Sequence, residues 1–140
     1  METRLEIYKM YVEMTDNLGT RRNQSNTYFI TIVSAIYIAF SITLEKTLIA
    51  LSINIVQASI SLIGILVCLT WILNIRSYKI LAKAKFDTIH DLEKQLPVGP
   101  YTREWEYVKK TKYTRITATE MGIPYLFMLP FLTLLILTLI

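Results

Sequence analysis

Three long stretches without a charged residue limit what this chain can fold into. Residues 23–44, 47–75 and 121–140 contain no Asp, Glu, Lys, Arg or His. Each stretch has about 20 residues or more, the length that an α-helix needs to cross the hydrocarbon core of a bilayer. Hydrophobic residues make up 53% of the 140-residue chain and charged residues 19%, which argues against an ordinary soluble domain. The sequence therefore predicts an all-α integral membrane protein with transmembrane helices at residues 23–44, 53–75 and 121–140.

Basic residues are distributed unevenly between the segments that flank these predicted spans. Residues 1–22 carry four Lys or Arg, and residues 76–120 carry ten against six acidic residues. The connection at residues 45–52 carries only one of each sign. Because segments rich in Lys and Arg stay on the cytoplasmic side, we expect the N-terminus and residues 76–120 to be cytoplasmic. The turn at residues 45–52 and the C-terminus are then extracytoplasmic.

Four residues are predicted to anchor the helices at the membrane interface. Arg21 and Arg22 directly precede the first span, Arg76 directly follows the second, and Trp105 lies in the segment before the third. Long basic side chains and amphipathic aromatic rings both favour the level of the lipid headgroups. We therefore expect anionic headgroups on the cytoplasmic side as lipid partners. Because the basic excess lies beside the spans, no nucleic acid partner is expected.

The segments outside the spans are predicted to form a cytoplasmic helical layer. Residues 1–22 have the apolar spacing of an amphipathic helix, and residues 76–120 are interpreted as a helical extension of the second span followed by a loop. An apolar stripe runs along this extension: Phe86, Ile89, Leu92 and Leu96. Such a stripe needs a partner. The N-terminal helix is the nearest one, and the same stripe of a neighbouring subunit is the alternative.

Small side chains recur every four residues along the first span and form one face. Thr31, Ala35 and Ala39 belong to this face, and Gly64 lies on a similar small face of the second span. In lipid, small residues let helix backbones approach closely, and threonine can form hydrogen bonds across the contact. The two faces could pack together within one subunit, or one could contact a neighbouring subunit. We assign these four residues to helix packing or to an oligomer interface.

The chain shows no residue pattern typical of an enzyme, a metal site or a cofactor site. His90 is the only histidine, and it shares a helix face with Asp87, which is a weak signal because a metal site needs at least three ligands. The spans contain amides and hydroxyls but no ionisable group at depth, which disfavours a proton-coupled transporter. A pore formed by several subunits remains open. We therefore expect no enzymatic activity and no cofactor.

Several short motifs follow one another in a characteristic order along the chain. They are YKMY at residues 8–11, Asp16, Arg21-Arg22, NTYF at 26–29, Trp71, Ser77-Tyr78, AKF at 84–86, LEKQLP at 92–97, Glu104-Trp105, Tyr113, Thr117, Glu120 and Ile123-Pro124. In order and spacing they resemble the RipA family of octameric membrane proteins. The resemblance implies a small bacterial inner-membrane protein that assembles as a ring of eight. Ala82 departs from the pattern, which has an asparagine before the AKF element.

These observations predict a non-enzymatic homo-oligomer of the inner membrane, octameric according to the resemblance. Its role is interpreted as that of a scaffold or a pore-like ring. The alternative is a membrane-perturbing effector of a bacterial conflict or defence system, triggered by a partner or ligand. That alternative depends on a looser likeness to small membrane effector modules, which also place a cytoplasmic helical portion beside a pair of spans. The expected partners are other copies of the chain, the lipid bilayer and an unidentified protein.

Overall fold

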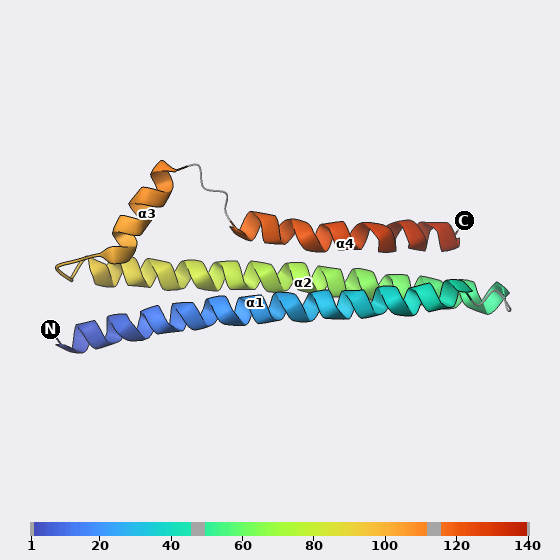
Figure 1. The fold of residues 1–140 in the computed structure, drawn as a ribbon, viewed down its shortest axis with the longest axis horizontal. Coiled ribbons are helices and arrows are strands. Elements are labelled where there is room, and N and C mark those ends of the chain that lie inside the picture. Colours follow the sequence, from blue (N-terminus) through green and yellow to red (C-terminus); the bar gives the residue numbers. More distant parts are fainter. Residues whose placement is uncertain (1, 46–49, 112–115, 140) are drawn as a thin grey trace.

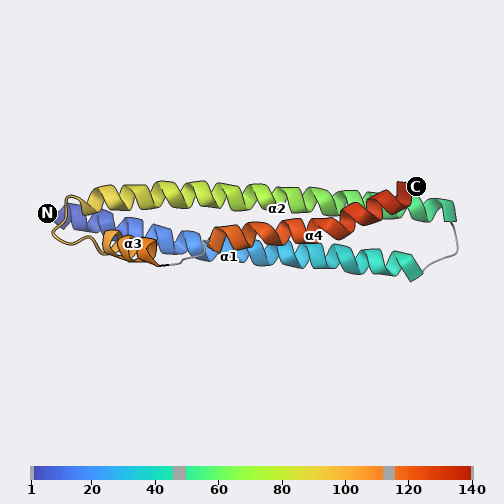
Figure 2. The same cartoon turned by 90° about the horizontal axis from the view of Figure 1, so that it is seen from above.

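Four α-helices make up nearly all of the chain in a computed structural model that describes residues 2–45, 50–111 and 116–139. They are α1 (Glu2–Glu45), α2 (Ala50–Glu93), α3 (Pro100–Lys110) and α4 (Ile116–Leu139). The helices α1 and α2 have 44 residues each and lie side by side in opposite directions over most of their length (Figures 1 and 2). The helix α4 packs along the half of α2 that is nearer to α2's first residue (Figure 1). No strand is present among the described residues.

Three of these helices are long and apolar enough to cross a membrane. The stretches that qualify by length and composition are Thr3–Thr43, Asn54–Glu93 and Ala118–Thr138. Each covers most of one of the three charge-free runs of the sequence, so the predicted all-α architecture with three transmembrane helices is confirmed. The protein is a multi-pass membrane protein.

The first two helices continue without a break past the ends of the apolar spans. Helix α1 runs through residues 22 and 23, the expected boundary between an N-terminal helix and the first span. Helix α2 likewise continues past Arg76 as far as Glu93. At 1.5 Å per residue each helix is about 66 Å long, roughly twice the thickness of the hydrocarbon core. From here on, the extension means residues 3–22 of α1 together with residues 76–93 of α2. Figure 1 shows that these two helix segments project beyond α4.

Aromatic side chains fill the space between α1, α2 and α4 within the spans. Phe29 of α1 stacks on Trp71 of α2 with ring centroids 5.8 Å apart, and Ile75 completes a buried cluster with them. About two turns further along α1, Tyr37 stacks on Phe131 of α4 with ring centroids 4.4 Å apart. Because lipid tails are as apolar as these side chains, close van der Waals packing rather than hydrophobic burial holds the helices together here.

The predicted small-residue faces do not pack on each other within the chain. Thr31, Ala35 and Ala39 all lie on the exposed side of α1. The larger side chains of Phe29 and Val33 occupy the side of α1 that is buried in the bundle. Small side chains permit a close approach of helices, but the large aromatic rings on the opposite side of α1 bury more surface and determine which side faces α2.

Gly64 instead lets α4 approach α2. A Cβ atom built on Gly64 would lie 2.7 Å from three ring carbons of Phe131, whose side chain is completely buried. Real Cβ atoms essentially never come this close to another heavy atom. The structure therefore places Gly64 in a helix–helix contact inside the chain, with α4 as the partner.

Pro124 and Pro130 lie inside α4, and the helix continues through both residues. A proline lacks an N–H group and disturbs the helix hydrogen bonds of the preceding turn. The Tyr37 hydroxyl donates a 2.7 Å hydrogen bond to the carbonyl oxygen of Phe127, which lies in the turn before Pro130. A neighbouring helix thus supplies a donor where the proline weakens the backbone ladder, as membrane helices require.

Candidate functional site

Two side-chain hydrogen bonds join α1 and α2 where the apolar spans end. The indole Nε1 of Trp71 donates to Oδ1 of Asn26 at 3.0 Å, and the hydroxyl of Ser25 donates to Oδ1 of Asn74 at 2.8 Å. These contacts give a structural role to Ser25 and Asn26 of the polar run that begins the first charge-free stretch. A buried indole N–H needs an acceptor, and α1 provides one at the level where Trp71 would otherwise face only apolar groups.

An ion pair joins α1 to the start of α4 at nearly the same level. An Nη atom of Arg22 lies 2.8 Å from Oε2 of Glu120, and the two side chains are 22% and 20% exposed. The two atoms are close enough for an ion pair, but they do not form a hydrogen bond. Among the described residues, Oε2 of Glu120 has no hydrogen-bond partner. A partly exposed pair of this kind contributes about 1 kcal/mol or less. Its main consequence is to fix where α4 begins relative to α1.

The residues predicted as membrane-interface anchors lie in different environments. Arg21 and Arg76 are exposed at the ends of the charge-free stretches, whereas Arg22 is held by Glu120. Trp105 lies on α3, with Lys109 Nζ 5.5 Å from the centroid of its ring. Figure 1 shows α3 beside the outer end of the extension, beyond the first residue of α4. The structure thus brings Trp105 together with the extension and not with the three arginines.

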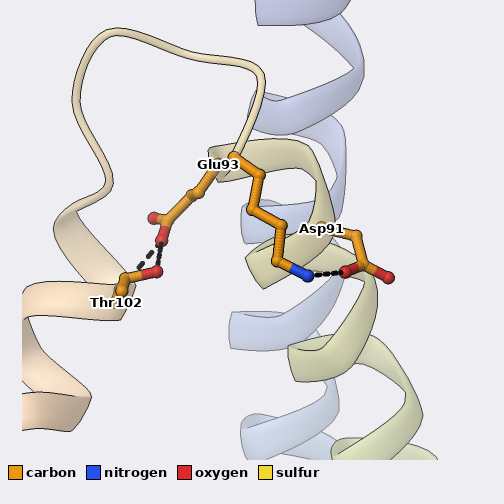
Figure 3. Close-up of polar contacts among 4 residues, drawn as sticks. Asp91, Glu93 and Thr102 are labelled. Carbon is orange, nitrogen blue, oxygen red and sulfur yellow. Dashed lines mark hydrogen bonds and ion pairs between the residues drawn. The ribbon is translucent and has the colours of Figure 1, made fainter.

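The most enclosed polar group of the extension is the carboxylate of Glu93 at the end of α2 (Figure 3). Its side chain is only 4% exposed. Oε1 accepts hydrogen bonds from the Tyr8 hydroxyl (2.9 Å) and the backbone N–H of Tyr101 (2.8 Å). Oε2 accepts from the backbone N–H of Thr102 (2.8 Å) and from its hydroxyl (2.6 Å). One carboxylate therefore connects the beginning of α1, the end of α2 and the start of α3.

Glu93 acts as the N-cap of a helix to which it does not belong. Helix α3 starts at Pro100, and the preceding Gly99 has no side chain to cap it. The first N–H groups of a helix need acceptors, and a negative charge is favourable there. The Glu93 carboxylate satisfies the N–H groups of Tyr101 and Thr102. Sequence reasoning missed this role, although a Gly-Pro helix start without a capping side chain is the signal that an outside acceptor is needed.

The hydrogen bonds to Glu93 outweigh the effect of its burial on ionisation. Burial alone raises the pKa of the Glu93 carboxyl, but the hydrogen bonds from Thr102, Tyr101 and Tyr8 bring it below its ordinary value. Burial, and then the hydrogen bond to the Glu93 carboxylate and its negative charge, raise the pKa of the Tyr8 hydroxyl. At neutral pH the pair is therefore an ionised carboxylate that accepts a hydrogen bond from a protonated phenol. Nearby, Asp91 and Lys94 form an exposed ion pair at 2.7 Å (Figure 3).

The apolar stripe of the extension is partly covered within the chain. Ile89 is fully buried, and Leu92 and Leu96 are half-buried. Phe86 stays 38% exposed, with its ring centroid 5.9 Å from that of Tyr101 on α3. Helices α1 and α3 both contact this part of the chain, as the Tyr8 and Tyr101 bonds to α2 show. The N-terminal helix is thus a partner of the stripe, and Phe86 is its most exposed member.

A groove of about 480 Å³ opens between α1, α2 and α3 where the extension meets the spans. Helix α1 contributes one wall and the floor: Thr15, Asp16, Leu18, Gly19, Thr20 and Arg22. Helices α2 and α3 contribute the rest: Tyr78, Ala82, Phe86, Tyr101 and Glu104. The groove therefore combines aromatic rings, hydroxyls and charges of both signs. His90 lies outside it, and no cluster of three or more possible metal ligands occurs among the described residues.

The comparison with known proteins assigns the chain to a family. The model of the octameric membrane protein family (8xMP) matches residues 5–140. No curated protein and no solved structure matches the chain. The matched residues include all three apolar helices and the extension with its Glu93 contacts. Because this match covers nearly the whole chain, the protein belongs to the octameric membrane protein family.

Proposed function

We propose that the protein is a non-enzymatic, homo-octameric assembly of the bacterial inner membrane that acts as a scaffold or a pore-like ring. The family name supports the octamer, and the ordered motifs that resemble RipA support the narrower family likeness and the bacterial location. The observation that carries the proposal is the chemistry of the exposed face of α1. In a span that contains no charge, this face carries a row of small and hydroxyl-bearing side chains, interrupted by the exposed Ile38 and Ile42.

The exposed faces of α1 and α4 differ in a way that distinguishes protein contact from lipid contact. Large apolar side chains dominate the exposed face of α4: Leu126, Leu129, Ile136 and Leu137. The exposed side of α1 also has large apolar side chains, Ile38 and Ile42, but it includes a row of small ones that α4 lacks: Thr27, Thr31, Ser34, Ala35 and Ala39. Lipid tails suit the first surface, whereas small and hydroxyl-bearing side chains are enriched where membrane helices pack closely. We therefore assign the α1 face to contacts with the next copy of the chain.

The threonine hydroxyls of this face already donate within α1. Thr27 Oγ1 donates a 3.1 Å hydrogen bond to the carbonyl of Asn23, and Thr31 Oγ1 donates one of 2.9 Å to the carbonyl of Thr27. A neighbouring helix can approach without leaving these two donors unpaired. The remaining lone pairs of the hydroxyls are free to accept a hydrogen bond from that neighbour or from water. The same face thus suits either a close subunit contact or the wall of a central opening.

The orientation proposed from the sequence places the extension in the cytoplasm. The excess of Lys and Arg beside the spans supports it. Eight copies of the extension would then surround one axis and form a multivalent cytoplasmic surface. This arrangement favours a scaffold that binds an unidentified protein partner. Such a role requires no catalytic residue.

Two matched substitutions test the subunit contact. Thr31 of α1 and Thr133 of α4 are both exposed, and each hydroxyl donates to a carbonyl of its own helix. Thr31→Leu enlarges the proposed contact face, whereas Thr133→Leu enlarges the proposed lipid face. Light scattering of the detergent-solubilised complex, with the detergent mass separated, should give about eight subunits for the wild type and for Thr133→Leu. A smaller assembly is expected for Thr31→Leu.

Other outcomes would contradict the proposal in distinguishable ways. A monomeric wild type would contradict the octamer. An unchanged mass for Thr31→Leu would contradict the assignment of this face of α1 to the subunit contact. Conductance of the wild-type complex in planar bilayers decides between a pore-like ring and a closed scaffold. Collapse of the membrane potential on overexpression would instead indicate the membrane-perturbing effector.

A further inference from the structure

The groove between α1, α2 and α3 exists because two short residues line it. Gly19 on α1 and Ala82 on α2 both border the space. A Cβ atom added at Gly19 would meet nothing within 4 Å. Larger residues at these two positions would fill the volume of about 480 Å³. Leu18 and Thr15, which are both buried, form its floor.

The charges of the groove are ordered along the direction perpendicular to the membrane. Arg22 is adjacent to the first charge-free span, so it lies at the end of the groove nearest the hydrocarbon core. Asp16 is six residues earlier on the same helix, about 9 Å further out. Glu104 lies on α3, which flanks the outer part of the extension (Figure 2). A positive charge is thus followed outward by two negative charges.

The outer end of the groove combines negative charge with aromatic surface. The ring centroids of Phe86 and Tyr101 lie 5.9 Å apart. Burial raises the pKa of the Tyr101 hydroxyl, and the negative charges of Asp16, Glu104 and Glu93 raise it further. That shift shows that three carboxylates act on one aromatic ring. Carboxylates and aromatic faces together are the usual surroundings of a bound organic ammonium group.

The inner end of the groove offers donors for an anion. The Arg22 guanidinium has five N–H groups, and its contact with Glu120 uses one terminal nitrogen. The remaining donors, and the hydroxyl of Thr20, which also borders the groove, are suited to phosphate oxygens. The Thr20 hydroxyl has only one hydrogen, which it donates to the carbonyl of Asp16 at 3.3 Å, so it could donate to a phosphate only by breaking this long bond. Arg22 is therefore the principal group for an anion.

We propose that this groove binds the headgroup of a zwitterionic phospholipid, with the phosphate at Arg22 and the terminal ammonium between Asp16, Glu104 and the Phe86–Tyr101 ring pair. In such a lipid the phosphate lies next to the hydrocarbon core and the ammonium lies further out, which is the order of the complementary charges in the groove. The inference needs the multi-pass membrane location and not the octamer. Its failure would leave the proposed assembly unaffected.

Lipid retention tests this inference on the intact complex. The protein is reconstituted in nanodiscs that contain equal amounts of phosphatidylethanolamine and phosphatidylglycerol, then transferred to detergent and washed. Mass spectrometry measures the ratio of the two lipids that remain bound. The wild type should retain phosphatidylethanolamine in excess. Glu104→Gln should lower that excess at least about threefold, the effect of one modest cation-binding contact.

Control variants separate the groove from the general charge of the surface. Glu106 is exposed on α3 two residues from Glu104 and does not border the groove, so Glu106→Gln should keep the excess. Ala82→Leu fills the groove without changing a charge and should lower retention like Glu104→Gln. Circular dichroism of each variant shows whether the helices have formed. If Ala82→Leu does not fold, the comparison of Glu104→Gln with Glu106→Gln decides alone.

Three results would overturn the inference. Equal retention of both lipids by the wild type, or equal losses in Glu104→Gln and Glu106→Gln, would show that the groove does not select the headgroup. Retention of phosphatidylglycerol in excess would show that only the basic side chains matter. A third arm titrates soluble phosphorylethanolamine into the complex in pure phosphatidylglycerol nanodiscs. If this compound binds while phosphatidylethanolamine is not enriched, the ligand is a free metabolite and the lipid assignment is wrong.

Discussion

The hydroxyl of Tyr8, near the start of α1, donates a 2.9 Å hydrogen bond to Oε1 of Glu93, which lies 85 residues later at the end of α2. The same carboxylate accepts the first N–H groups of α3. Within the described part of the chain, no residue of α3 is buried. The position of α3 therefore depends on Glu93 and on the contact between Phe86 and Tyr101 far more than on an apolar core.

Replacing Glu93 should release α3 from the extension. In Glu93→Ala the N–H groups of Tyr101 and Thr102 lose their acceptor, which costs about 0.5–2 kcal/mol, as the loss of an N-cap does. Hydrogen exchange followed by mass spectrometry should show faster exchange in Pro100–Lys110, with α4 unchanged. Asp91→Ala is the matched control, because Asp91 lies two residues away in an exposed ion pair (Figure 3). Equal exchange in the two variants would contradict the capping role.

The protection of α3 should depend on pH in the acidic range. The folded-state pKa of Glu93 is lower than its ordinary value of 4.5. A carboxylate of this kind contributes its full stabilisation above 4.5 and loses it as the pH falls through the lowered folded value. The protection factors of α3, which compare its exchange with the intrinsic amide rate at the same pH, should therefore fall on acidification below 4.5. Glu93→Gln should be less protected at neutral pH and much less sensitive to acid. A wild type whose α3 protection is flat through this range would exclude Glu93 as the responsible group.

Gly64 should tolerate no side chain, in contrast to Gly122. A Cβ at Gly64 would lie 2.7 Å from the Phe131 ring, whereas nothing lies within 4 Å of one at Gly122. Gly64→Ala forces α2 and α4 apart and should cost about 1–3 kcal/mol. Gly122→Ala should be neutral or stabilising by up to about 1 kcal/mol, because alanine favours helix. The thermal midpoint of the complex in detergent measures both effects.

A second substitution shows whether the Phe131 ring is the obstacle. Phe131→Leu removes most of the ring volume next to Gly64. The double variant Gly64→Ala with Phe131→Leu should therefore lose less stability than the two single losses added together. Strict additivity would mean that the ring and the new methyl group do not meet.

The sequence predicts the helices of this protein well because bilayer physics acts on local patterns. Charge-free runs of about 20 residues identify the spans whatever their partners are. The sequence likewise predicts that α2 continues beyond the membrane as a helical extension, and this helix ends at Glu93. Neither inference requires knowledge of which helix faces which.

Helix partners are less predictable, because one helix carries more than one plausible contact face. The small residues of α1, such as Ala35, predicted a close contact but not its partner, and Phe29 and Val33 occupy the side that faces the bundle. The capping role of Glu93 could not be predicted from the sequence for a similar reason. A cap is normally sought within a few residues before the helix, and this one belongs to the preceding helix.

The motifs that resemble RipA contain pairs of residues that meet in the structure. Tyr8 of YKMY contacts Glu93 of LEKQLP, and Arg22 contacts Glu120. Each pair joins elements that are far apart in the sequence. Motif order thus contained information about tertiary contacts that periodicity could not supply. Asn26 of NTYF and Trp71 form a further such pair.

Removing the acceptor of the Trp71 indole should destabilise the junction between the spans and the extension. Trp71 is 1% exposed, and its Nε1–H donates to Asn26 Oδ1 at 3.0 Å. In Asn26→Ala this buried donor has no partner from α1, which costs about 1–3 kcal/mol. Asn23→Ala is the control, because Asn23 is exposed one turn earlier on the same helix. In a Trp105→Phe background the fluorescence reports Trp71 alone, since the chain has two tryptophans. The unfolding midpoint should fall in Asn26→Ala only; an equal fall in both variants would mean that the hydrogen bond contributes nothing specific.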